Sequence, residues 1–118
     1  METKFKALIV WLILNGKVEE ALELLAEHYG VDVPKIRVGL PKGRRRNVFG
    51  CYTAKNVTIF VLNSDVLKEP FTVLHEFYHH LRTVGGVKHK GTEKYANEFA
   101  KDFIRSYKLM SENDCKRV

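Results

Sequence analysis

Cysteine, proline and glutamine are scarce in this sequence, which has two cysteines, three prolines and no glutamine. Cys51 and Cys115 are far apart and stand in no metal-binding spacing, which excludes a disulfide framework and favours a reducing compartment such as the cytoplasm. The longest apolar run, Ala7 to Leu14, is well short of the roughly 20 residues that span a bilayer, so no transmembrane segment is expected. The absence of glutamine and the abundance of charge are typical of a thermophile's protein.

The composition is that of a single folded domain. Of 118 residues, 45% are hydrophobic and 29% are charged, which leaves room for one core and excludes a disordered or low-complexity chain. We expect the domain to span residues 1–110 and residues 111–118 to form a polar tail. The net charge of +6 permits an acidic partner. The basic cluster of Lys42 and Arg44 to Arg46 has no interleaved aromatic residues, so we interpret it as a solvated turn and expect no nucleic acid.

Hydrophobic periodicity divides the chain into helices and strands. It predicts helices over residues 5–14, 18–29, 70–83 and 92–108, and strands over 35–40, 47–54 and 57–62. This pattern predicts an α+β fold in which a small three-stranded, largely antiparallel sheet packs with about four helices. The strand over 57–62 would be either an edge strand that pairs with an extended peptide or an ordinary paired strand. The apolar first helix would be part of the core or a dimer contact, in a monomer or weak homo-oligomer.

The most informative segment is His75-Glu76-x-x-His79, within the third predicted helix. Residues i and i+4 lie one turn apart on the same helix face, so both imidazoles can bind one tetrahedral Zn²⁺. Glu76 lies about 100° around the helix from His75, where it can take a proton from a water on the metal and pass it to a leaving amine. A separate side of the helix carries the apolar residues predicted to face the core, which are Leu74, Phe77, Tyr78 and Leu81.

A catalytic zinc needs a third protein ligand and an open position for water. Glu93, in the first turn of the last helix, is the best candidate, and the small Ala96 permits close approach of the two helices. Otherwise Glu93 is a first-turn carboxylate favoured by the helix dipole. His89 is the alternative third ligand, or a donor to the oxyanion that forms at the scissile carbonyl. Asn97, one turn after Glu93, could support a ligand through a hydrogen bond. His80 points away from the zinc-binding face, and we expect it to support the ligands or lie at the surface.

The segments HEFYHH and GTEKYANEFAKDF resemble the gluzincin metallopeptidases, in which HExxH is followed by a glutamate on a second helix, often within ExxA[DN]. The arrangement from Val18 onward is similar to the minigluzincins of thermophilic archaea, to ImmA/IrrE-like peptidase domains and to the catalytic cores of membrane-bound gluzincins. The resemblance implies that His75 and His79 are zinc ligands, Glu76 the general base and acid, and Glu93 the glutamate ligand. It also implies hydrolysis of peptide bonds in a peptide or protein substrate.

The polar tail supports a further hypothesis about regulation. Glu112, Asp114 and Cys115 are possible zinc ligands on a segment that could fold back into the cleft and occupy the open position, which would keep the enzyme latent. Minigluzincins are similar in holding themselves latent through C-terminal segments. The alternative is a solvated tail that touches nothing. For the whole protein, the alternative to a peptidase is a catalytically silent regulatory or interaction module that keeps zinc for stability.

Overall fold

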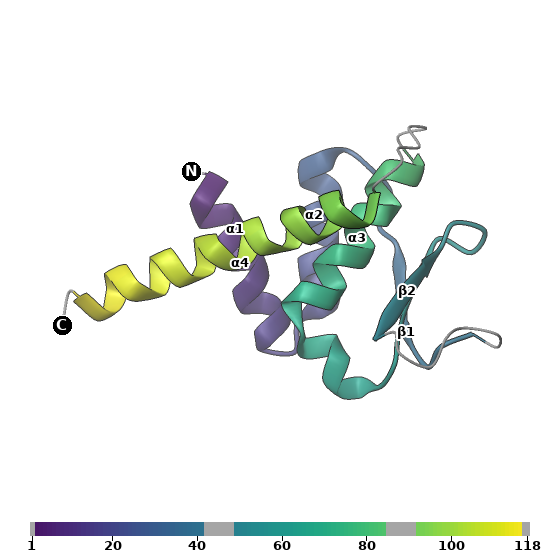
Figure 1. Cartoon of the computed structure of the whole chain (residues 1–118), viewed down its shortest axis with the longest axis horizontal. Helices are drawn as coiled ribbons and strands as arrows, with labels where there is room; N and C mark the ends of the chain where they lie inside the picture. Colours follow the sequence, from purple (N-terminus) through teal and green to yellow (C-terminus); the bar gives the residue numbers. More distant parts are fainter. Residues whose placement is uncertain (1, 42–48, 85–91, 117–118) are drawn as a thin grey trace.

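The computed structural model describes residues 2–41, 49–84 and 92–116 (Figure 1). Within these residues the chain forms four α-helices, one short 3-10 helix and three strands. The predicted α+β fold, with four helices and a three-stranded sheet, is confirmed. In chain order the elements are α1 (Glu2–Leu14), α2 (Val18–Tyr29), β1 (Lys35–Val38), β2 (Gly50–Thr53), β3 (Thr58–Val61), η1 (Ser64–Lys68), α3 (Pro70–Val84) and α4 (Thr92–Lys116).

The first two helices follow their sequence signals closely. α2 has the bounds that its periodicity predicts. It ends where Gly30 adopts a left-handed conformation with φ of 69°, which directs the Gly30 N–H back to the carbonyls of Ala26 and Glu27. α1 begins earlier than its apolar pattern, at Glu2, because an acidic first-turn residue favours a helix start without adding to that pattern. Ile9 and Ile13 of α1 are fully buried, so this helix belongs to the core.

The sheet has the strand order β1-β3-β2, with β1 parallel and β2 antiparallel to β3. It is therefore mixed: one of its two pairings is antiparallel and the other is parallel, whereas the sequence predicts a largely antiparallel sheet. The edge position considered for residues 57–62 is wrong, because β3 is the central strand and the alternative of an ordinary paired strand is correct. Burial explains this order: Ile59 and Val61 of β3 are fully buried, whereas Lys35 and Val38 of β1 are exposed.

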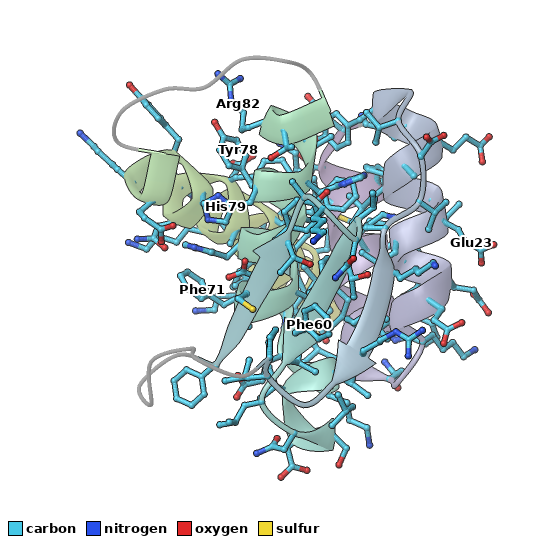
Figure 2. All side chains as sticks on the ribbon, turned by 90° about the vertical axis from the view of Figure 1, so that its right-hand side faces the viewer. Glu23, Phe60, Phe71, Tyr78, His79 and Arg82 are labelled. Atoms are coloured by element: carbon cyan, nitrogen blue, oxygen red, sulfur yellow. The ribbon has the colours of Figure 1, made fainter. Side chains whose placement is uncertain are left out.

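The helices gather on one face of the sheet, which Figure 2 shows with the strands in front and α3 directly behind them. α3 packs against β2 on one side and against α4 on the other, and α4 also packs along α1. One continuous core joins these elements; its largest members are Ile9, Ile13, Leu22, Leu25, Ile59, Leu74, Phe77 and Phe103. No helix among the described residues is both long and apolar enough to cross a membrane. α3 is thus held on two sides by packed elements.

α4 is longer than predicted. It continues to Lys116 instead of ending near Lys108, because no glycine or proline interrupts the chain after Thr92. Residues 111–116 are therefore the last turns of a continuous helix whose far end projects away from the sheet (Figure 1). At a rise of about 1.5 Å per residue, the backbone at residue 112 lies roughly 28 Å along the helix from Glu93. In this arrangement the proposed inhibitory segment does not reach Glu93 of the same chain.

Candidate metal centre

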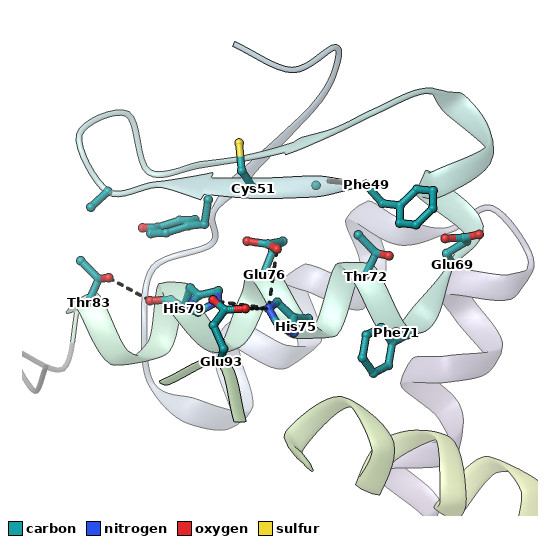
Figure 3. A pocket seen from close by; sticks show the side chains of 13 residues that line it. Phe49, Cys51, Glu69, Phe71, Thr72, His75, Glu76, His79, Thr83 and Glu93 are labelled. Carbon is teal, nitrogen blue, oxygen red and sulfur yellow. Dashed lines mark hydrogen bonds and ion pairs between the residues drawn. The ribbon is translucent and has the colours of Figure 1, made fainter. Parts of the chain in front are cut away.

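α3 presents two different faces. Its buried face consists of Val73, Leu74, Phe77 and His80, all of which are completely inaccessible to solvent. Tyr78 and Leu81, also predicted to face the core, are half-buried. The opposite face carries His75, Glu76 and His79 toward a cleft (Figure 3). The helix thus has the two-sided character that its sequence predicts, with the HExxH side chains on the side away from the core.

Three side chains converge in the cleft. Nε2 of His75 lies 3.0 Å from Oε2 of Glu93, and Nε2 of His79 lies 2.9 Å from Oε1 of Glu93. The two Nε2 atoms are 3.2 Å apart. Glu93 comes from the first turn of α4, which packs against α3, and the small Ala96 in the next turn is fully buried. The structure therefore brings together the two histidines and the glutamate that the sequence singles out.

The spacing of these three groups fits a divalent cation. Two ligands that bind a tetrahedral zinc at 2.0–2.2 Å lie roughly 3.3 Å from each other. The two Nε2 atoms are 3.2 Å apart, and each lies 3.0 or 2.9 Å from a different oxygen of the Glu93 carboxylate, so these separations are of that order. Two imidazole nitrogens and one carboxylate are also a donor set that zinc prefers. Among the described histidine, cysteine, aspartate and glutamate residues, this is the group whose arrangement could hold a metal.

Burial favours the form of His79 that a metal requires. The pKa of His79 is lowered, chiefly because burial disfavours the charged ring; attraction to Glu93 opposes this effect, and the neighbouring His75 adds to it. A lower pKa keeps the imidazole neutral, with a lone pair available for a metal. Nδ1 of His75 is buried and makes no hydrogen bond with a described residue. Phe71, whose ring centroid is 6.0 Å from that of His75, packs beside this ring.

Glu76 lies beside the three converging groups without joining them. Its carboxylate Oε2 is 4.0 Å from Nε2 of His75, and the residue is 8% exposed. The side chain projects between α3 and β2 (Figure 3). Gly50 of β2 faces it closely: a Cβ at Gly50 would lie 3.5 Å from Cγ of Glu76 and only 2.9 Å from Cγ2 of Thr72. The carboxylate therefore lies next to His75, where β2 passes close to the helix.

The cleft around these residues has a volume of about 830 Å³. One wall is α3, the other is β2 with the residues beside it, and Glu93 contributes from α4. Two exposed phenylalanines, Phe49 and Phe71, lie at one end of the cleft and Thr83 lies at the other (Figure 3). The cleft is therefore elongated along α3 and is open to solvent at the three converging side chains.

The remaining predicted site residues have different outcomes. His89, the basic cluster from Lys42 to Arg46, and the side chains of Asp114 and Cys115 lie outside the described part of the chain. Asn97 is half-buried one turn after Glu93 and makes no side-chain hydrogen bond with a described residue. Its supporting role stays a prediction.

His80 requires a correction. It points away from the cleft, as expected, but it is 0% exposed and not at the surface. Its Nε2 contacts the backbone carbonyl of Asp32, and its Nδ1 contacts the hydroxyl of Tyr52. Gly50 and Tyr52 also line the cleft, and neither is among the site residues that the sequence predicts. Successive strand residues point to opposite faces of a sheet. Gly50 and Tyr52 are two positions apart in a predicted strand, and this spacing could have placed them on the same side.

No family model matches this chain, and the searches of curated proteins and of solved structures found no match to it.

Proposed function

We propose that the protein is a zinc-dependent peptidase whose metal ligands are His75, His79 and Glu93. The observation that carries the proposal is the convergence of two imidazole nitrogens, 3.2 Å apart, on the Glu93 carboxylate, with each nitrogen 2.9–3.0 Å from one of its two oxygens. The Glu76 carboxylate lies next to them, 4.0 Å from Nε2 of His75. A structural zinc is normally closed by four protein ligands, whereas a catalytic zinc has three and an open position. The described residues offer three such ligands in a solvent-open cleft, which favours catalysis.

Each protein group has a chemical task in this proposal. Zinc at this position would supply Lewis-acid polarisation and a lowered pKa for water. Glu76 accepts a proton from the attacking water and donates it to the nitrogen of the leaving amine, which is general base and then general acid catalysis. Its low exposure strengthens its electrostatic interactions within the cleft. His75, His79 and Glu93 would hold the metal.

β2 supplies a surface for the substrate. The N–H of Leu62 bonds to the carbonyl of Phe49, and the register pairs Gly50 with Val61 and Tyr52 with Ile59. Since backbone groups alternate in an antiparallel pair, those of Gly50 and Tyr52 point away from β3. β2 is an outer strand of the described sheet and lines the cleft. An extended peptide can therefore pair with these groups and pass over the site, as strand addition requires.

Metal analysis with matched variants tests the proposal. Protein prepared in zinc-replete medium is expected to contain one zinc per chain, and His75→Ala and Glu93→Gln are expected to lose it. His28→Ala removes a histidine that stacks on Phe5 outside the cleft, and Glu98→Gln removes an exposed carboxylate of α4, so both should retain zinc. A wild-type protein without zinc, or ligand variants with normal zinc content, would contradict the proposed centre.

Peptide cleavage tests the reaction itself. A pool of unstructured peptides is incubated with the zinc-loaded protein, and new termini are identified by mass spectrometry. Cleavage is expected with zinc and is expected to stop when a chelator removes it. Retention of zinc with no cleavage of any peptide in the pool would favour the alternative of a catalytically silent zinc-stabilised module.

A further inference from the structure

One buried side chain joins three parts of the fold next to the candidate metal centre. Nε2 of His80 lies 2.7 Å from the carbonyl oxygen of Asp32, in the segment before β1. Nδ1 of the same ring lies 2.9 Å from the hydroxyl of Tyr52, in β2. His80 directly follows His79 on α3 and is fully buried. A single ring therefore connects the helix that carries both HExxH histidines to the strand that lines the cleft.

The partners of His80 determine the direction of both hydrogen bonds for the neutral ring. The carbonyl of Asp32 can only accept, so the proton of the imidazole lies on Nε2. Nδ1 is then an acceptor, and the hydroxyl of Tyr52 donates to it. Burial raises the pKa of the Tyr52 phenol, so the hydroxyl keeps the proton that it donates. Both ring nitrogens are satisfied, as a buried polar side chain requires.

Gly50 provides a second close contact between β2 and α3. A Cβ at this position would be 2.9 Å from Cγ2 of Thr72 and 3.1 Å from the carbonyl oxygen of Phe60. There is no room for a side chain, so β2 lies directly on the helix here. Gly50 and Tyr52 are also the two residues whose backbone groups point outward to a substrate. β2 is thus fixed against α3 at the two residues that would hold the peptide.

We propose that His80 is a positioning residue. Through its contact with Tyr52, it fixes the distance and the alignment of the outer edge of β2 relative to the metal ligands on the same helix. The inference rests on the proposed peptidase function and adds to it a determinant of substrate binding. His79 and His80 are consecutive, so about 100° of helical rotation directs one ring to the metal and the next to the strand. The distance between substrate edge and metal is then fixed within one short segment of α3.

Tyr52→Phe is the sharpest test, because it removes the hydroxyl and leaves the ring. With a peptide that the wild-type protein cleaves, we expect KM to rise about tenfold and kcat to change less than about twofold. Zinc content should stay at the wild-type value. Tyr29→Phe is the matched control, since it removes a phenol hydroxyl from a half-buried ring that contacts Phe77 of α3 but lies outside the cleft. It should leave KM unchanged.

Two substitutions of His80 separate positioning from general stability. The side-chain oxygen of His80→Asn can accept from Tyr52 in place of Nδ1, whereas His80→Leu offers no acceptor. We expect His80→Asn to keep KM closer to the wild-type value than His80→Leu. If these variants and Tyr52→Phe lower the unfolding temperature while KM stays at the wild-type value, His80 is merely structural and the inference is wrong.

A measurement that needs no activity keeps the inference separate from the proposed function. The amides of Cys51 and Thr53 pair with β3, so their hydrogen exchange reports how firmly β2 is held. Tyr52→Phe should accelerate this exchange at least fivefold relative to Tyr29→Phe. Unchanged exchange would overturn the inference even if peptides are cleaved. If Tyr52→Phe accelerates exchange but the wild-type protein cleaves no peptide, the attachment of β2 through Tyr52 is supported and the proposed peptidase function is wrong.

Discussion

Both faces of α3 carry histidines, but these differ in how completely their ring nitrogens are hydrogen-bonded. On the cleft face, Nε2 of His75 lies within 3.2 Å of His79 and Glu93, while its buried Nδ1 has no hydrogen-bond partner among the described residues. On the buried face, His80 has one partner for each nitrogen. Satisfied polar groups hold a fold together, whereas crowded and incompletely satisfied ones are expected where a ligand completes them.

This difference predicts that function and stability separate along one helix. Substitutions on the cleft face should change zinc binding or catalysis and have little effect on the folded state. Substitutions of the apolar residues on the buried face should destabilise the fold, and His80 is the buried-face residue that we expect to affect substrate binding as well, through Tyr52. For the residues other than His80, a mixture of effects on either face would weaken the distinction.

The largest effect is expected from Glu76→Gln. The amide has nearly the same shape as the carboxylate but cannot accept the proton, so the cleavage rate should fall by about 10²- to 10⁴-fold. Zinc content should remain that of the wild-type protein, since Glu76 is not one of the three residues that could hold the metal. Peptide cleavage followed by mass spectrometry, together with metal analysis, measures both. A variant that cleaves at the wild-type rate would exclude Glu76 as the catalytic base.

Phe77→Ala should have a comparable effect in free energy, but on folding. Phe77 is fully buried in the core, so its removal should lower the free energy of unfolding by about 3–5 kcal/mol. Phe71→Ala, on the same helix but in the cleft and partly exposed, is the matched comparison and should cost about 1 kcal/mol or less. Urea denaturation measures both. Equal losses would show that the two faces are not energetically distinct.

Zinc itself should stabilise the folded protein by an intermediate amount. A ligand that binds only the folded state at 100 times its Kd adds about 2.7 kcal/mol. We therefore expect added zinc to raise the Tm of the metal-free wild-type protein. Glu93→Gln should lose most of this increase while its metal-free stability stays close to that of the wild type, because the Glu93 side chain is 75% exposed. Thermal unfolding with and without zinc chloride provides the measurement, and an equal rise for both proteins would contradict Glu93 as a ligand.

The features that depend on local spacing could be predicted from the sequence. His79 is four positions after His75, and one helical turn makes their rings neighbours whatever the rest of the fold does. Glu93 and Ala96 lie within one turn of α4, so a close helix approach at the alanine brings the carboxylate to the histidines. The predicted bounds of α2 are also correct, because they depend on local signals: the periodicity of the helix and the glycine that ends it.

The features that depend on long-range pairing could not be predicted in this way. The central position of β3 depends on which strands pair with it across the fold, and periodicity within one strand does not contain that information. The burial of His80 depends on Asp32 and Tyr52, which are distant in sequence. Gly50 allows β2 to lie close to α3 because it has no side chain. The sequence does not show this, since it depends on the position of Thr72 in the fold.

A satisfied polar pair away from the cleft should give the smallest effect. Lys6 of α1 donates a hydrogen bond to Asp102 of α4, and this contact lowers the pKa of the Asp102 carboxyl. Because the folded pKa is the lower one, the pair stabilises the fold above the unfolded value of about 3.9, and this contribution is lost as the pH falls through the folded value. The Asp102 side chain is 46% exposed, so solvent screens the pair, and Asp102→Asn should cost roughly 0.5–1 kcal/mol near pH 7.

Urea denaturation of wild type and Asp102→Asn near pH 7 and about pH 2 tests this sign, since the carboxyl takes up a proton as the pH falls through its folded pKa. The difference in the free energy of unfolding should shrink at the lower pH. Glu98→Gln removes an exposed carboxylate of the same helix and should show no difference at either pH. Peptide cleavage by Asp102→Asn should equal that of the wild type, because this pair lies outside the cleft. A loss of cleavage would mean that the packing of α1 on α4 also controls the position of Glu93, and the separation of function from stability would then fail at α4.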